Sequence, residues 1–405
     1  MKPISLLFLG ILGGMLFNTT SCNSQGNTGP TKKISSTKFT EGKDYNIFTR
    51  ARVLDKTGFS KPVEAFSLLI PKGWKYSGDI LWTPPGSTCA GTNSYFKATS
   101  PDGKYSFELL PSVLWVYVTD PQLAQFQQQN SRSAYCSYGE PLDAEHYLKQ
   151  MFVPRELGNP QFLEMKTNEP GAREMQIKSE KYRQEMMSYN YGQINSYPSA
   201  INAKVKWNDG SEGIVTCGVL IMEGIIPNAY DGSYSKTYTS SAMERVVFKY
   251  PAGEGDKAVN MLSTIMSSVR TNTAWKNSVD NYWLQVRQKS YVNHIGKIKM
   301  MDDLTRQIGE QTIRNGQKNL NNIDVNMRSW EATQQSQDRM HTNFVKAIRE
   351  VENYQDATGK VELSSGYNHA WSRSDGSSFI MSNNPNFDPS SLFQDQRWKE
   401  MKKVD

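Results

Sequence analysis

Apolar and polar side chains alternate along several short stretches between residues 45 and 275, and this period of two predicts β-strands. The clearest stretch is "SYFKATSPDGKYSFELLP", in which Pro101, Asp102 and Gly103 supply the turn of a hairpin. A second hairpin is predicted for "INAKVKWNDGSEGIVTCGVLIM", and "EAFSLLIPKGW" predicts a strand that ends at a Pro-x-Gly turn. These stretches predict a largely antiparallel sheet.

Two other segments of this region have apolar positions at helical spacing. "EGDKAVNMLSTIMSSVR" places Ala258, Met261, Leu262, Ile265 and Val269 on one face, and "PLDAEHYLKQMFVPREL" also predicts a helix. "GAREMQIKSEKYRQEMMSYN" is compatible with one helix or with a strand followed by a helix. Together, the segments predict an α+β domain over residues 45–275, in which helices pack on an antiparallel sheet. An α-β-α sandwich is one such arrangement.

Between residues 276 and 352 the chain is polar, with apolar residues every three or four positions. This spacing predicts long amphipathic helices that form a helical hairpin, with glycines as candidate breaks. The apolar stripe either packs against the sheet or forms a docking face for a partner. Its clearest members are Leu320, Ile323, Met327, Trp330, Met340, Phe344, Ile348 and Val351.

Residues 353–405 predict a small β-meander, because Ser-Ser-Gly and Ser-Asp-Gly turns separate short alternating stretches. Within it, Tyr367, His369 and Trp371 occupy alternate positions and would share one face of a strand. An aromatic face with an imidazole suits a ligand such as a sugar ring or a peptide. The same face would equally suit a core packed on the long helices.

The N-terminus has the layout of an export signal. Lys2 precedes an apolar run from Ile4 to Phe17, and small polar residues then lead to Cys22. The run is shorter than the roughly 20 residues of a membrane-spanning helix. "NTTSC" resembles the end of a bacterial lipoprotein signal, although Thr19 stands where that family usually has Leu. The resemblance implies that residues 1–21 are removed, that Cys22 is lipidated with acyl chains such as palmitate, and that the protein is anchored to the cell envelope, at the outer membrane.

The polar segment 22–44 contains Gly and Pro and few apolar residues, and it predicts a flexible tether between the anchor and the folded part. Export permits disulfide formation. Cys89 and Cys136 both lie in loop-like stretches and are the expected pair. Cys217 lies in an apolar strand and is expected to be a buried, unreactive thiol.

The sequence contains no recognisable catalytic motif: it lacks GxSxG, P-loop, HExxH and CxxC patterns. Its four histidines are His146, His294, His341 and His369, and they fall in different predicted elements, so neither a metal nor a cofactor is expected. His146, His294 and His341 are expected on solvated helix surfaces. "NPNFDP" has oxygen ligands that suit calcium, but it also has the chemistry of ordinary turns.

Two resemblances extend this interpretation. "FSLLIPKGW" and "AVNMLSTIMSSVRTN" resemble the opening strand and closing helix of PsbP/Mog1-like domains, which implies an α-β-α sandwich acting as an accessory or assembly factor for protein partners. That family has no catalytic residues to transfer to this sequence. The segment containing "VELSSGYNHAW" and "NPNFDP" resembles a C-terminal module found in uncharacterised exported bacterial proteins.

Composition and charge narrow the choice of function. The chain has 405 residues and a net charge of +6, and it contains no Lys/Arg run of the kind that binds nucleic acid. We therefore expect a lipid-anchored cell-envelope protein that is a non-catalytic binding or assembly module for a protein partner or ligand. One alternative is an envelope hydrolase that assembles His146 or His369 with a carboxylate or a serine only on folding. The other is a helical spacer.

Overall fold

The computed structural model describes residues 39–85, 89–130, 136–187, 193–227, 234–292, 336–348, 351–356, 359–393 and 397–404. The chain divides into two units, 1–38 and 39–405, and all the described residues belong to the second. The expected signal peptide, Cys22 and most of the tether lie outside the described residues. No helix in the described part is long and apolar enough to cross a membrane.

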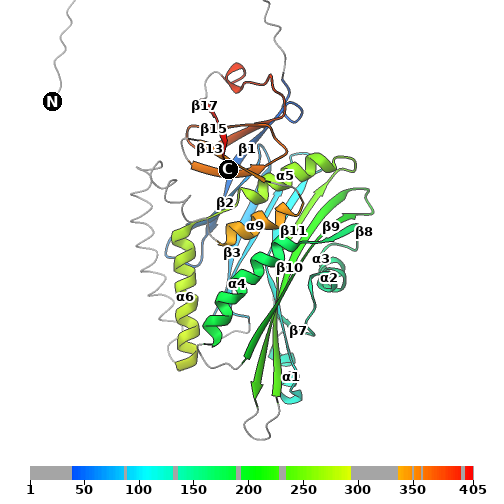
Figure 1. Ribbon diagram of the computed structural model, residues 1–405, viewed down its shortest axis with the longest axis vertical. Coiled ribbons are helices and arrows are strands. Elements are labelled where there is room, and N and C mark those ends of the chain that lie inside the picture. Colours follow the sequence, from blue (N-terminus) through cyan, green and yellow to red (C-terminus); the bar gives the residue numbers. More distant parts are fainter. Residues whose placement is uncertain are drawn as a thin grey trace, which may run out of the picture. The chain divides into compact units, whose positions relative to one another are not determined.

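The largest sheet has nine strands, and its long central strands cross the molecule in Figure 1. All its strand pairs are antiparallel except β6 with β7. Seven strands form its main path, in the order β3 (Lys75–Thr83), β4 (Gly91–Thr99), β5 (Ser106–Leu110), β11 (Tyr234–Tyr250), β10 (Glu212–Pro227), β9 (Gln193–Lys206) and β8 (Gln161–Thr167). The other two, β6 (Val113–Val118) and β7 (Cys136–Tyr138), branch from β11.

A second sheet joins the two ends of the described chain. Tyr45 lies opposite Ser382, so the strands near the C-terminus extend a sheet that the first strands begin. Its six strands run in the order β12 (Arg270–Thr271), β2 (Val63–Pro71), β1 (Tyr45–Asp55), β16 (Ser378–Ser382), β15 (His369–Arg373) and β17 (Trp398–Glu400). A third sheet has the order β14 (Gly359–Ser364), β13 (Val351–Asp356) and β18 (Lys402–Val404). The domain boundaries expected from the sequence remain a prediction.

Helices α4, α5 and α9 lie across one face of the long strands (Figure 1). The undecided segment at 171–190 is helical from Glu169 to Met187, as α4. The segment starting at Pro141 contains two short α-helices with a π-helical turn between them. The described helices are α1 (Pro121–Asn130), α2 (Ala144–Tyr147), η1 (Leu148–Phe152), α3 (Val153–Glu156), α4, α5 (Gly255–Ser267), α6 (Thr273–Val292), α9 (Ser336–Lys346) and η2 (Pro389–Ser391).

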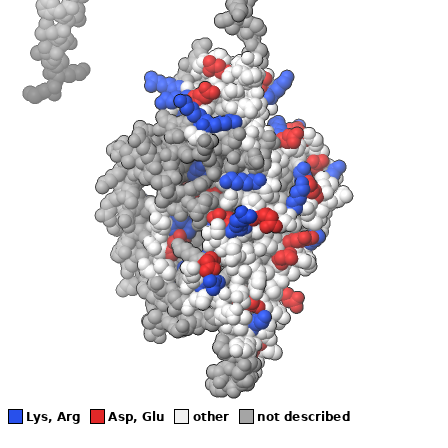
Figure 2. Space-filling model, viewed as in Figure 1, with Lys and Arg blue, Asp and Glu red and all other residues white. Residues whose placement is uncertain are grey.

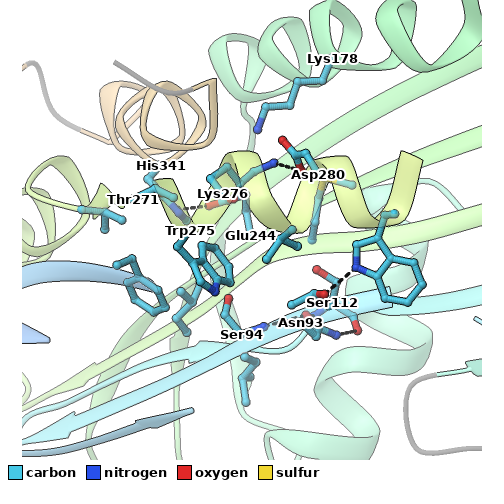
Figure 3. A pocket seen from close by; sticks show the side chains of 18 residues that line it. Asn93, Ser94, Ser112, Lys178, Glu244, Thr271, Trp275, Lys276, Asp280 and His341 are labelled. Atoms are coloured by element: carbon cyan, nitrogen blue, oxygen red, sulfur yellow. Dashed lines mark hydrogen bonds and ion pairs between the residues drawn. The ribbon is translucent and has the colours of Figure 1, made fainter. Parts of the chain in front are cut away.

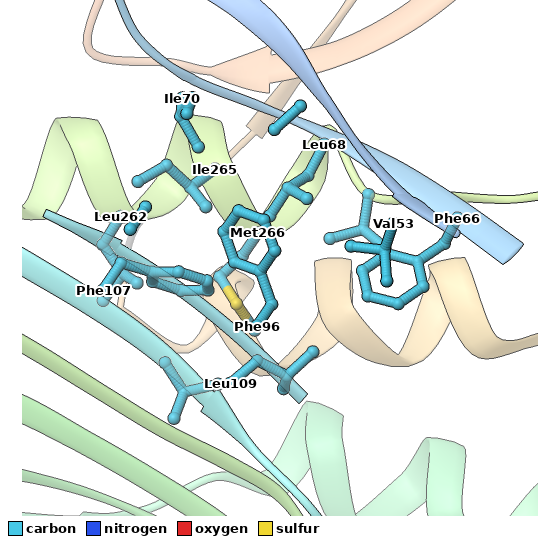
Figure 4. Packing of buried hydrophobic residues seen from close by; sticks show 14 of the residues in the cluster. Val53, Phe66, Leu68, Ile70, Phe96, Phe107, Leu109, Leu262, Ile265 and Met266 are labelled. Atoms are coloured by element: carbon cyan, nitrogen blue, oxygen red, sulfur yellow. The ribbon is translucent and has the colours of Figure 1, made fainter. Parts of the chain in front are cut away.

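The main hydrophobic core lies between β2, the β3–β5 part of the large sheet, and α5. Figure 4 shows Phe96, Phe107 and Met266 meeting at its centre. The periodicities read from the sequence account for this core, because the alternating face of the hairpin and the helical face of 258–269 both point into it. The mixed, mostly antiparallel fold is therefore confirmed.

The helical hairpin expected over 276–352 is not shown. Of this range, 276–292 lie in α6 and Ser336–Lys346 form α9, whereas 293–335 and 349–350 lie outside the described residues. Val351, expected in the apolar stripe of a helix, is the first residue of strand β13. Helix α9 packs against α4 and α5, and it supplies Phe344 and Val345 to two different buried clusters. Its apolar residues are therefore used in the fold of the sheet domain.

Candidate functional site

A cavity of about 380 Å³ lies between helices α4, α6 and α9 on one side and strands β4, β5 and β11 on the other (Figure 3). In Figure 3, Lys178, Lys276, Asp280 and His341 come from the helices, whereas Glu244, Asn93, Ser94 and Ser112 come from the strands and the turn after β5. The lining combines large apolar groups with a few polar ones, as is usual in small-molecule sites. Its apolar members are Phe66, Leu109, Leu110, Met243, Val269, Trp275, Val279 and Trp283.

A β-bulge directs Glu244 into this cavity. Thr216 pairs with Val246 and Gly218 pairs with Met243, so Glu244 and Arg245 both lie opposite the single residue between Thr216 and Gly218. Glu244 has a φ of 52°, in the left-handed region that is unusual for a non-glycine residue. Such strain, in a residue that is only 5% exposed, is more frequent at functional sites than elsewhere.

The bulge turns the next residue, Arg245, into a different buried environment. Its guanidinium donates to the carbonyl of Pro111 at 2.6 Å and pairs with Glu156. It also lies 4.5 Å from the ring centre of Phe152, in cation–π contact. These contacts hold Arg245 in place, and they fix the backbone that presents Glu244.

Helix α9 supplies a buried imidazole to the same cavity. Nδ1 of His341 lies 2.6 Å from Oε2 of Glu244, and the two side chains are only 5% and 2% exposed. Neither atom makes a hydrogen bond to any described residue, so the contact is a close approach without hydrogen-bond geometry. Sequence patterning placed His341 on a solvated helix surface, and that prediction is wrong because α9 packs inward against α4 and α5.

Two contacts fix α9 at this position. Asp338 accepts hydrogen bonds from the backbone N–H of Thr271 at 3.0 Å and from its hydroxyl at 2.8 Å. Burial raises the pKa of Asp338 above its ordinary value. Phe344 packs on Gly218, where an added Cβ would lie 2.7 Å from the ring, so a glycine is required for this close approach. His341 therefore sits on a rigidly held helix.

Lysines from two helices complete the charged side of the cavity. Lys276 of α6 pairs with Asp280 one turn further along the same helix. Lys178 of α4 borders the cavity. Part of its side chain remains accessible to solvent, and protein atoms surround the rest closely. This desolvation lowers the pKa of Lys178 to about 8, against the opposing attraction of Glu244 and other carboxylates.

Two tryptophans of α6 line the cavity in fixed orientations. The indole N–H of Trp283 donates to the hydroxyl of Thr92 at 2.7 Å, and that of Trp275 donates to Oδ2 of Asp55 at 2.9 Å. Trp283 also stacks on Trp82, with ring centres 6.0 Å apart. The aromatic part of the wall is therefore preorganised before any ligand binds.

The aromatic group predicted in the C-terminal strand does not form one face. Tyr367 belongs to one buried cluster and Trp371 to another, because a bend at Asn368 interrupts the alternation before β15 begins at His369. His369 stacks on Trp371 at 5.8 Å, and its side chain is 34% exposed. Most of this group is thus packed into the protein, which leaves His369 as its accessible member.

The cysteines expected to pair, Cys89 and Cys136, form a disulfide. Cys217 is a free thiol with no exposed surface, and burial raises its pKa to about 12. His146 lies on the surface, where its ring contacts Asp143 at 2.9 Å. His294 falls outside the described residues. Within the described ranges, no group of three or more His, Cys, Asp or Glu side chains could hold a metal ion.

No known family model, no curated protein and no solved structure matches this chain. The candidate site therefore rests on its own geometry. Sequence reasoning missed Glu244 and His341, and the one available signal was a charged pair, Glu244-Arg245, between apolar neighbours on both sides, Ala242-Met243 and Val246-Val247-Phe248.

Proposed function

We propose that this protein is a lipid-anchored component of the bacterial cell envelope, exported and attached at the outer membrane through Cys22. We further propose that its folded part is a non-catalytic binding module that also engages a protein partner. The proposal of anchoring is supported by the N-terminal sequence. The proposal of binding is supported by the cavity among α4, α6, α9 and the large sheet.

The cavity is the single observation that carries the binding proposal. Its volume of about 380 Å³ is at the lower end of the roughly 300–1,000 Å³ typical of small-molecule pockets. It contains a carboxylate and an imidazole that are buried against each other on a strained bulge, and burying such polar groups is costly for a folded protein. A structural core would more simply fill this space with apolar side chains.

Released-ligand analysis tests the binding proposal directly. The protein is purified from its native envelope, denatured, and the released small molecules are identified by mass spectrometry. Ser94→Phe should fill the cavity and abolish the released species, whereas Thr99→Phe on the same strand, outside the cavity lining, should retain it. Identical release from both variants, or none from the wild type, would contradict the proposal.

Metabolic labelling tests the anchor. A palmitate analogue should label the wild-type protein, and Cys22→Ala should remove the label and release the protein from the membrane fraction. Labelling that persists in Cys22→Ala would rule out this attachment site.

A hydrolase is the second candidate, and one observation favours it. The imidazole of His341 lies against the carboxylate of Glu244, with Nδ1 2.6 Å from Oε2, and Ser94 and Ser112 line the same cavity, so a candidate general base and candidate nucleophiles share one site. A fluorophosphonate probe would label a serine in the wild type and much less in His341→Gln if this candidate were correct. Absence of labelling in folded wild-type protein would remove it.

A further inference from the structure

Charges of both signs surround the cavity at short range. The lining contains two carboxylates, Glu244 and Asp280, together with Lys178, Lys276 and His341. Within this set, Lys276 pairs with Asp280, and His341 pairs with Glu244. The wall thus carries two carboxylates, one from β11 and one from α6, and two lysines, from α4 and α6, so neither sign dominates.

Charges of both signs also lie behind the wall. Electrostatic interactions connect Lys178 with Glu244, Glu174, Lys276 and Asp338. Asp338 in turn lies near Arg270 and His341. A ligand with one net charge would bring an unbalanced charge into a wall that is already balanced, and a buried unpaired charge is strongly unfavourable.

One part of the wall has a different character. Leu109 of β5 lines it from the sheet, and Val279 and Trp283 of α6 close it from the other direction. This apolar region lies within the same small volume as the charged groups. The site thus combines a dipolar half with an apolar half.

We propose that the cavity binds a small zwitterion that carries an apolar group, the chemistry of an apolar α-amino acid. Its ammonium group would face the carboxylates Asp280 and Glu244, its carboxylate would face the lysines, and its side chain would occupy the apolar half. The ligand adds charges of both signs and no net charge. This inference rests on the proposed binding function and specifies the class of ligand.

Matched probes test the inference. Phenylalanine, phenethylamine, 3-phenylpropionate and 2-phenylethanol share a phenyl group and are respectively a zwitterion, a cation, an anion and a neutral molecule. Binding to the mature full-length protein is measured by isothermal titration calorimetry at pH 7. We expect phenylalanine to bind at least about tenfold more tightly than each of the other three probes, a difference of about 1.4 kcal/mol.

Variants connect the preference to the wall. Asp280→Asn should weaken the binding of phenylalanine relative to that of 3-phenylpropionate. Lys178→Met should weaken the binding of phenylalanine relative to that of phenethylamine. Lys104→Met, on an exposed side chain outside this cavity, should change neither ratio. Each ratio is measured within one variant, so a general loss of stability does not imitate the effect.

Failure of the inference can be distinguished from failure of the proposed function. If a singly charged or neutral probe binds with an affinity within threefold of that of phenylalanine, the proposal of a zwitterionic ligand is wrong, but the cavity can still be a binding site. If no probe binds, the proposal of a zwitterionic ligand is also wrong. The released-ligand comparison of Ser94→Phe with Thr99→Phe uses no probe and would still decide whether the cavity binds a ligand.

Discussion

Asp55 and Trp275 are 220 residues apart in the chain, and a hydrogen bond of 2.9 Å joins the indole N–H of Trp275 to Oδ2 of Asp55. The same oxygen accepts from the indole of Trp82 at 3.0 Å. Oδ1 accepts from the backbone N–H groups of Thr57 and Gly58. This fully buried carboxylate therefore connects β1, β3 and α6, and α6 supplies the aromatic wall of the cavity.

Asp55→Asn should destabilise the fold strongly. The amide can accept on one side only, so its NH₂ group would meet either two indole donors or two backbone donors. A buried donor left without an acceptor costs about 1–3 kcal/mol, and we expect a loss of about 2–4 kcal/mol in the free energy of unfolding. Urea denaturation measures it. Asp256→Asn, on an exposed residue of α5, is the control and should change little.

The connection through Asp55 illustrates what sequence patterns can and cannot predict. The alternation around Phe107 and the helical face around Leu262 are local, and each predicts its element and its buried side correctly. Tyr45 and Ser382 pair although they are more than 300 residues apart in the chain. A local hydrophobic periodicity contains no information about which distant strand will be the partner.

The candidate site was still less predictable. Glu244 reaches the cavity through a bulge, and a bulge shifts the face of every following residue by one position. His341 lies in a polar stretch that resembles a solvated helix, and only the packing of α9 on α4 and α5 buries it. A rule based on period two predicts one face for Tyr367 and Trp371, because such a rule does not detect the bend at Asn368.

Removing both members of the Glu244–His341 pair should cost less stability than the two single removals added together. Glu244→Gln or His341→Gln alone leaves a buried polar group without its partner, which costs about 3–5 kcal/mol. The double variant should lose less than the sum of the two. A double-mutant cycle on the free energy of unfolding measures this coupling.

An exposed pair of the same chemistry is the control for this cycle. His146 and Asp143 also lie 2.9 Å apart, but their side chains are 57% and 49% exposed. His146→Gln should change stability by less than about 1 kcal/mol, because water screens exposed charges. Equal effects at His146 and His341 would show that the burial of the Glu244–His341 pair has no energetic importance.

Reduction of the disulfide should weaken the protein. Cys89 and Cys136 are separated by 47 residues, so the bond restricts a long loop in the unfolded chain. We expect Cys89→Ser with Cys136→Ser to lower the free energy of unfolding by about 2–5 kcal/mol. Dithiothreitol should lower the free energy of unfolding of the wild type by a similar amount and should not change that of the double variant. A stability of the wild type that is insensitive to dithiothreitol would indicate that this bond does not contribute.

Lys178 should give the protein a measurable pH dependence. Its pKa is about 8 in the folded protein and near its ordinary value of 10.5 in the unfolded chain. Between these values the unfolded chain binds more protons, so the contribution of Lys178 to stability rises with pH. The stability of the wild type relative to Lys178→Met should therefore increase from pH 7.0 to 9.5 in urea denaturation, whereas the comparison with Lys104→Met should stay flat. A constant difference for Lys178→Met would show that its ammonium is as well solvated in the cavity as in water.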